Sequence, residues 1–318
     1  MAQTQKNKIN AYSFAFHSKM SYNEISRYED GGLKAEHKEI LGDNHFNTLK
    51  NFCLSNIDEQ RAQLIRNEKE VIEAHIEALF LLDSNQTILS YILPNLDGIL
   101  YECPTSAKHI YNLQLKNKRD VVEKLHYFVA NRENNYNTVI NDSVARVFAF
   151  LLSEQHHYNH FIEDTKIFIK NTVITASKSS KNFSDYLIMV CLSHVLLVPG
   201  MSKYFLQELD GMRVIKDILT QHSNDLQIMY YSFLVLWILS FEEESQRAFS
   251  NPSGLIISKV INALKNISRE KLSRIAFKMF QNISKWDDCV ELMVDNNLSK
   301  VVENELKKNL KDEKLKEN

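Results

Sequence analysis

The residues best placed to do chemistry are the histidines of the run Gln155-His156-His157-Tyr158-Asn159-His160. On a helix, His156 and His160 would share one face, and two imidazoles at that spacing can bind zinc. A zinc site needs more ligands, but no glutamate follows His156 as in zinc proteases, and no third ligand is identifiable. A polar turn after the apolar segment that ends at Leu152 is the alternative, and the sequence favours it. We predict no metal site.

Motifs for other kinds of catalysis are missing. Adjacent glycines occur at Gly31-Gly32 without the Gly-Lys-Ser/Thr that completes a phosphate-binding loop. There is no Gly-x-Ser-x-Gly elbow and no Cys-x-x-Cys pair. The four cysteines lie far apart, and we expect reduced thiols packed in helices: Cys53, Cys103, Cys191 and Cys289. We predict no catalytic residue and no cofactor. The remaining enzymatic alternative depends on the His156/His160 pair.

Two further clusters allow a functional and a structural interpretation. Glu242-Glu243-Glu244 can bind a cation or a basic partner, or it can be a solvated first helical turn that the helix dipole stabilises. Trp237, with Tyr230-Tyr231, can form an aromatic recognition surface. Its helical spacing from Phe233 favours a place in the core instead.

The charge balance excludes several classes of partner. The chain has 38 Lys and Arg against 40 Asp and Glu, a net charge of −2. Nucleic-acid binding and adhesion to anionic membranes both depend on concentrated basic charge, so we predict neither. No apolar run is long enough to span a bilayer, and the polar first ten residues do not resemble a signal peptide. We predict a cytosolic protein without direct membrane insertion.

Composition and periodicity predict an all-α fold. Only 7 Gly and 4 Pro occur among 318 residues, too few for the many turns of a strand-rich fold. Apolar residues recur at helical spacing almost everywhere. We expect Asp43 to cap a helix, Pro94 and Pro104 each to lie in the first turn of a helix, and Pro199-Gly200 to end the helix that closes at Val198. Beyond Val302 a Lys/Glu-rich solvated helix is predicted.

An internal repeat of 43 residues marks the second half. Asp210-Gly211-Met212, Ser253-Gly254-Leu255 and Asn296-Asn297-Leu298 follow at this constant interval. The middle residue of each segment (Gly211, Gly254 or Asn297) is expected to adopt a left-handed backbone in a turn between helices. The long helices between them correspond at the same shift, in the pairs Met229/Leu272, Phe233/Ala276, Leu236/Met279 and Trp237/Phe280.

A period of this length is typical of armadillo/HEAT-type helical repeats, whose units bury their apolar faces against one another. We predict such a repeat domain over residues 21–302, an N-terminal segment over 1–20 and a charged tail over 303–318. The Trp and Asn ladder of armadillo nuclear-import receptors is absent, because Phe241 follows Trp237 four residues on, and Ser284 follows Phe280.

Several segments, in one order along the chain, resemble the regulatory H subunit of the vacuolar-type proton-pumping ATPase (V-ATPase). The helix from Asp225 to Phe241 resembles the family's Gln-x-x-Tyr, apolar run and Trp-x-x-x-Phe, on Gln227, Tyr230 or Tyr231, Trp237 and Phe241. Weaker likenesses are Ile25 to Glu29, Tyr91-Ile92-Leu93, Phe205 with Asp210-Gly211, and Arg269 to Ile275 followed by Phe280-Gln281-Asn282. The sequence departs from the family where Ser202 or Lys203 replaces an arginine, and it ends before the family's second, C-terminal domain.

The resemblance implies a non-catalytic regulatory subunit on the cytosolic face of vacuolar, endosomal or lysosomal membranes. Its implied partners are the peripheral-stalk subunits E and G, the N-terminal domain of subunit a and other soluble-sector subunits. The alternative is a generic armadillo adaptor of the cytosol. The family-matching or interface positions to examine are Arg27, Tyr28, Glu29, Gln227, Trp237, Arg274 and Asn282.

Overall fold

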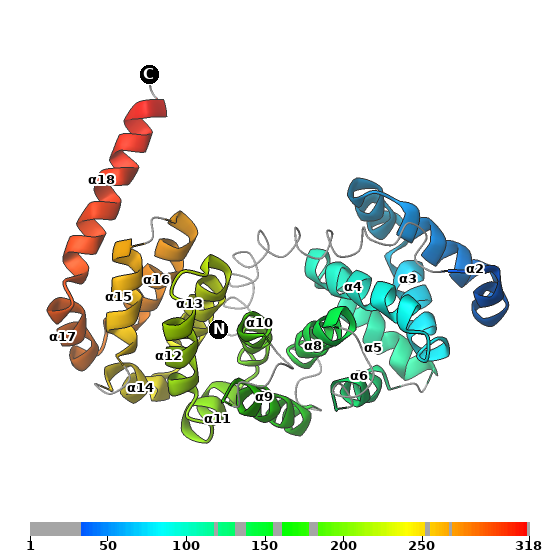
Figure 1. The fold of residues 1–318 in the computed structure, drawn as a ribbon, viewed down its shortest axis with the longest axis horizontal. Coiled ribbons are helices and arrows are strands. Elements are labelled where there is room, and N and C mark those ends of the chain that lie inside the picture. The colour runs from blue at the N-terminus through cyan, green and yellow to red at the C-terminus, as the bar shows by residue number, and fades with distance from the viewer. Residues whose placement is uncertain are drawn as a thin grey trace. The chain divides into compact units, whose positions relative to one another are not determined.

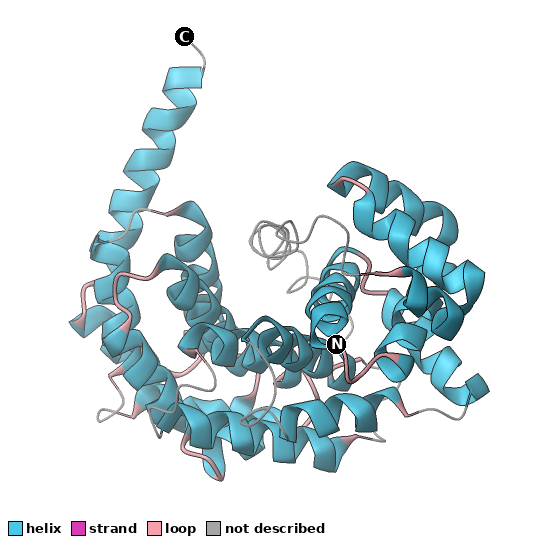
Figure 2. Cartoon of the chain, turned by 45° about the vertical axis from the view of Figure 1, so that its right-hand side comes forward, coloured by secondary structure: helices cyan, strands magenta, loops and turns pink. Residues whose placement is uncertain are grey.

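The computed structural model describes residues 33–117, 120–130, 138–154, 161–177, 184–251, 255–266 and 269–316. All regular secondary structure within these ranges is helical, as Figure 2 shows. The predicted all-α helical-repeat fold is therefore confirmed for the described part of the chain. The chain divides into two compact units, Met1–His160 and Phe161–Asn318, which are described separately.

The first unit is a packed set of helices (Figure 1). Helix α2 packs on α3, α4 packs on α8, and α5 contacts both α3 and α6. Apolar residues that recur at helical spacing in this half are buried, including Leu49, Ile72, Leu125 and Phe148. The helices are α2 (Ala35–Leu54), α3 (Ile57–Leu81), α4 (Gln86–Glu102), α5 (Ser106–Asn117), α6 (Val121–Ala130) and α8 (Thr138–Leu152).

Of the helix starts predicted in this unit, the one at Pro94 is wrong. Pro94 lies in the middle of α4, where it removes one backbone hydrogen bond. The helix continues because its apolar residues are buried on all sides, and this packing outweighs the local loss. The helix start predicted at Asp43 is correct to within one residue. Helix α2 is kinked at Gly42, whose φ of 75° only glycine adopts readily, and a second helical stretch begins directly after it, at Asp43.

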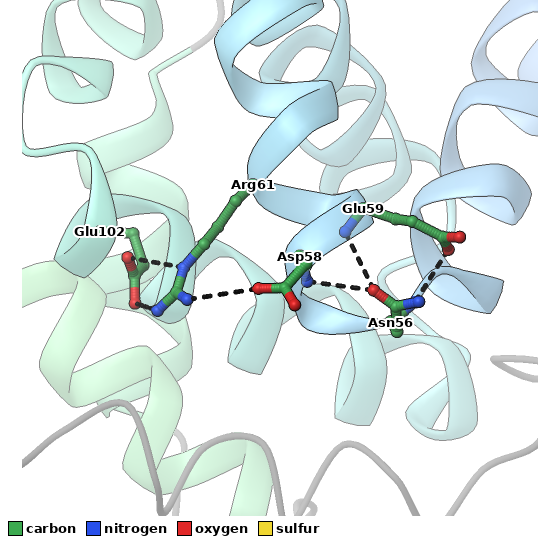
Figure 3. A network of polar contacts seen from close by, with 5 residues as sticks. All are labelled: Asn56, Asp58, Glu59, Arg61 and Glu102. Atoms are coloured by element: carbon green, nitrogen blue, oxygen red, sulfur yellow. Dashed lines mark hydrogen bonds and ion pairs between the residues drawn. The ribbon is translucent and has the colours of Figure 1, made fainter.

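The start of α3 is fixed by a capping box (Figure 3). The Asn56 side-chain oxygen accepts hydrogen bonds from the backbone N–H groups of Asp58 (3.1 Å) and Glu59 (3.0 Å), and the Glu59 carboxylate accepts one from the Asn56 N–H (3.2 Å). These bonds satisfy N–H groups that have no partner within the helix. Beside the cap, Arg61 forms a two-bond ion pair with Glu102 at the end of α4, at 2.9 and 3.2 Å. The pair ties α3 to α4 at the surface.

The core of this unit also contains charged and polar groups. Arg146 of α8 donates from Nε to Asp97 of α4 at 2.6 Å, and both side chains are about one-tenth exposed or less. His75 of α3 is fully buried, with Nδ1 2.7 Å from the carbonyl oxygen of Val71 and an edge-on contact to Phe52. Its Nε2 has no hydrogen-bond partner in the described structure. Both sites put polar atoms where burial makes an unpaired group costly.

The second unit stacks its helices in rows. One row consists of α9, α12, α15 and α18, and a second of α10, α13 and α16. The helices are α9 (Ile162–Ser177), α10 (Asp185–Val195), α11 (Met201–Gln207), α12 (Gly211–Gln221), α13 (Leu226–Leu239), α14 (Gln246–Ser250), α15 (Ile256–Asn266), α16 (Glu270–Ile283), α17 (Asp287–Asp295) and α18 (Leu298–Lys316), with a 3-10 turn at Glu243–Ser245.

The repeat predicted for this half is confirmed. Helices α12 and α15 each have 11 residues, and α13 and α16 each have 14. The eight residues paired at the 43-residue shift are all buried: Met229, Phe233, Leu236, Trp237, Leu272, Ala276, Met279 and Phe280. Equivalent positions in the two repeats therefore have equivalent surroundings, because each repeat stacks on the next in the same way.

The turns between repeats differ from the prediction. Asn297 has the expected left-handed backbone, with φ 60°, but Gly211 does not; there the positive φ falls on the preceding residue, Asp210 (50°). In the next turn between repeats, Leu255 has a φ of 51°. Gly254 lies outside the described residues. Gly211 is required for a different reason: a Cβ there would lie 2.3 Å from the ring of Phe205, which is buried. The missing side chain lets α11 and α12 approach closely.

We expect Gly211→Ala to lower the free energy of unfolding by about 1–3 kcal/mol, because an added carbon in a packed site forces neighbours to shift. The measurement is urea denaturation followed by far-UV circular dichroism. Gly98→Ala in α4 is the matched control, since nothing lies within 4 Å of a Cβ there. The control is expected to stabilise by about 0.5–1 kcal/mol as a helical glycine is removed. Equal effects of the two substitutions would contradict the packing explanation.

Two further boundaries complete the fold. Helix α10 ends at Val195, three residues before the predicted end, and Gly200 adopts φ 83° just before α11 begins. Helix α18 continues through the Lys/Glu-rich stretch after Val302 as far as Lys316. Among the described helices, none combines the length and the apolar character needed to cross a membrane.

Candidate interaction surface

The candidate residues that the structure describes lie on two neighbouring helices of the second unit. Gln227 and Trp237 belong to α13, and Arg274 and Asn282 belong to α16, which packs beside it. Arg27, Tyr28 and Glu29 lie outside the described residues. The structure therefore places four of the seven candidate positions.

Trp237 and Asn282 come together at the ends of their helices. The Asn282 side-chain N–H donates to the Ser240 hydroxyl oxygen at 2.8 Å, and that hydroxyl donates to the Trp237 carbonyl at 2.6 Å. The Trp237 side chain is 4% exposed, and its ring lies 5.6 Å from that of Phe241. This chain of hydrogen bonds links adjacent repeats, and the indole contributes to the core and not to an exposed recognition surface.

Gln227 and Arg274 lie away from this pair. Gln227 is the second residue of α13, about 15 Å along the helix from Trp237 at 1.5 Å per residue. Arg274 is exposed on α16 and pairs with Glu270 one turn earlier. The four described candidates thus do not converge on one site. Trp237 and Asn282 lie where α13 and α16 are joined. Arg274 faces solvent, and Gln227 lies near the start of α13.

Arg274 belongs to a row of exposed side chains that we call the α16 basic row: Lys271, Arg274, Lys278 and Gln281. At 100° per residue these four positions fall within an arc of about 80° and extend about 15 Å along the helix. Lys278 Nζ donates to the Gln281 side-chain oxygen at 3.3 Å. Lys285 follows in the next turn, 4.5 Å from the ring centroid of Trp286. Counting exposed positions at helical spacing could have identified this row from the sequence.

Helix α16, which bears the α16 basic row, differs from α10 and α13, the two other helices stacked with it. Every residue of α13 from Ile228 to Leu239 is buried, and so is every residue of α10 from Leu187 to Ser193. Such helices are apolar all round because neighbours cover all their faces. Helix α16 buries one face against α13 and α15 and leaves the opposite face to solvent. It is therefore the member of this row that offers a polar surface along its length.

Two kinds of chemistry were considered in the sequence, metal binding and thiol chemistry. No group of three or more His, Cys, Asp or Glu side chains in the described ranges is arranged to hold a metal ion; the His156/His160 pair lies outside these ranges. Burial raises the pKa of the Cys53 thiol to about 12 and that of Cys289 to about 11. The pKa of Cys103 is also raised, chiefly by burial and further by Glu68 and Glu102. These thiols are weak nucleophiles because the reactive thiolate is disfavoured.

A family model and a curated relative match this chain. A family model described as the H subunit of the V-ATPase matches residues 34–318, and so extends over helices of both units. A curated relative, the H subunit of the V-type proton ATPase of Dictyostelium discoideum, is 19% identical over 223 residues, which are 69% of this chain and 48% of the relative. The chain spans about half the length of the curated relative that it matches.

Proposed function

Since the chain belongs to the family of V-ATPase H subunits, we propose that it is a non-catalytic regulatory subunit of such a proton pump. In this role it binds the peripheral-stalk subunits E and G and the N-terminal domain of subunit a, and it supports coupled ATP-driven proton transport. It acts from the cytosolic side of vacuolar, endosomal or lysosomal membranes. The observation that carries the proposal is the family match over residues 34–318.

The stacked helices support a binding role without an active site. Helical repeats present elongated surfaces on which a partner makes many modest contacts, instead of a deep pocket that surrounds a small molecule. In the second unit, α13 is committed to the core, whereas α16 keeps a polar face in solvent. The cysteine pKa values described above also disfavour thiol chemistry. A protein of this kind stabilises a stalk by spreading the contact over many side chains.

The proposal is tested by capture and by deletion. Affinity capture of the tagged chain from its native cells, followed by mass spectrometry, is expected to enrich subunits E, G and a. Deletion of the chain is expected to remove most ATP-driven proton uptake by isolated organelle membranes. Capture of other cytosolic proteins with no pump subunit would favour the generic adaptor instead. Full coupled uptake and an unchanged pump composition after deletion would refute the proposal.

A further inference from the structure

We draw no further inference here: the strongest candidate, the exposed face of α17 on which Asp287, Asp288, Glu291 and Asp295 lie beside the exposed Val294, carries nothing because it is a cluster of carboxylates and no second feature of the described residues indicates what would bind there.

Discussion

Arg146→Ala is expected to lower the free energy of unfolding of the first unit by about 3–5 kcal/mol, as seen when one partner of a buried ion pair is removed. The Arg146 guanidinium donates to Asp97 at 2.6 Å and lies 3.4 Å from the Ser143 hydroxyl. Without it, the Asp97 carboxylate remains at a site where its side chain is only 8% exposed. The loss therefore comes mainly from a buried charge that has lost its cation.

Urea denaturation at neutral pH measures this effect, and two comparison variants define its origin. Arg61→Ala removes an arginine from the surface pair with Glu102, where the Arg61 side chain is 44% exposed. It should cost less than about 1 kcal/mol, because water screens the exposed pair. The double variant Asp97→Leu/Arg146→Met should recover most of the lost stability, since no charge is then left buried. A loss for Arg146→Ala as small as that for Arg61→Ala would show that burial does not control this pair.

The second large effect is a loss of stability in acid that depends on His75. Burial lowers the pKa of His75 from its ordinary 6.5 to about 4, an effect that the bond to Val71 only partly offsets. Between these values the unfolded chain binds a proton that the folded chain does not, so stability falls as the pH falls. At about 1.4 kcal/mol per pKa unit, the loss approaches about 3 kcal/mol near pH 4.

His75→Leu isolates this contribution, since leucine fills a similar volume and cannot bind a proton. Val71 keeps the backbone hydrogen bond that its carbonyl makes within the helix. Other groups titrate in both proteins, so the difference in unfolding free energy between variant and wild type is the relevant quantity. This difference should grow in favour of the variant as the pH falls from about 6.5 to about 4. A difference that stays constant across this range would mean that His75 does not titrate as its burial requires.

The sequence was sufficient for features that depend on neighbours along the chain. The helical period of apolar residues predicted an all-α fold, in which residues at that spacing such as Ile72 and Leu79 are buried, and the 43-residue shift predicted that α13 and α16 are equivalent. The α16 basic row belongs to the same class, although only Arg274 of its residues was predicted as a candidate. Periodicity survives folding here because each repeat repeats the packing of the one before it.

Local residue types failed where packing overrode them. Pro94 continues a helix that its own chemistry disfavours, because the surrounding side chains of α4 are buried. The turn before α12 places its positive φ on Asp210, while Gly211 is needed only for its closeness to Phe205. In both places a contact with another element decides the outcome, and local propensity is weaker than such contacts.

Taken alone, the amino-acid order determined that this chain is helical, that its second half repeats and that its charges are balanced, because each of these is a sum or a spacing along the chain. Only the tertiary structure decided which polar groups are buried and which are exposed. Asp97 and Arg146 are 49 residues apart, and nothing near either one in the sequence indicates the other. Burial arises when distant segments meet. For this reason the loss of an arginine is expected to change the free energy of unfolding strongly in α8 (Arg146) and weakly at the surface of α3 (Arg61).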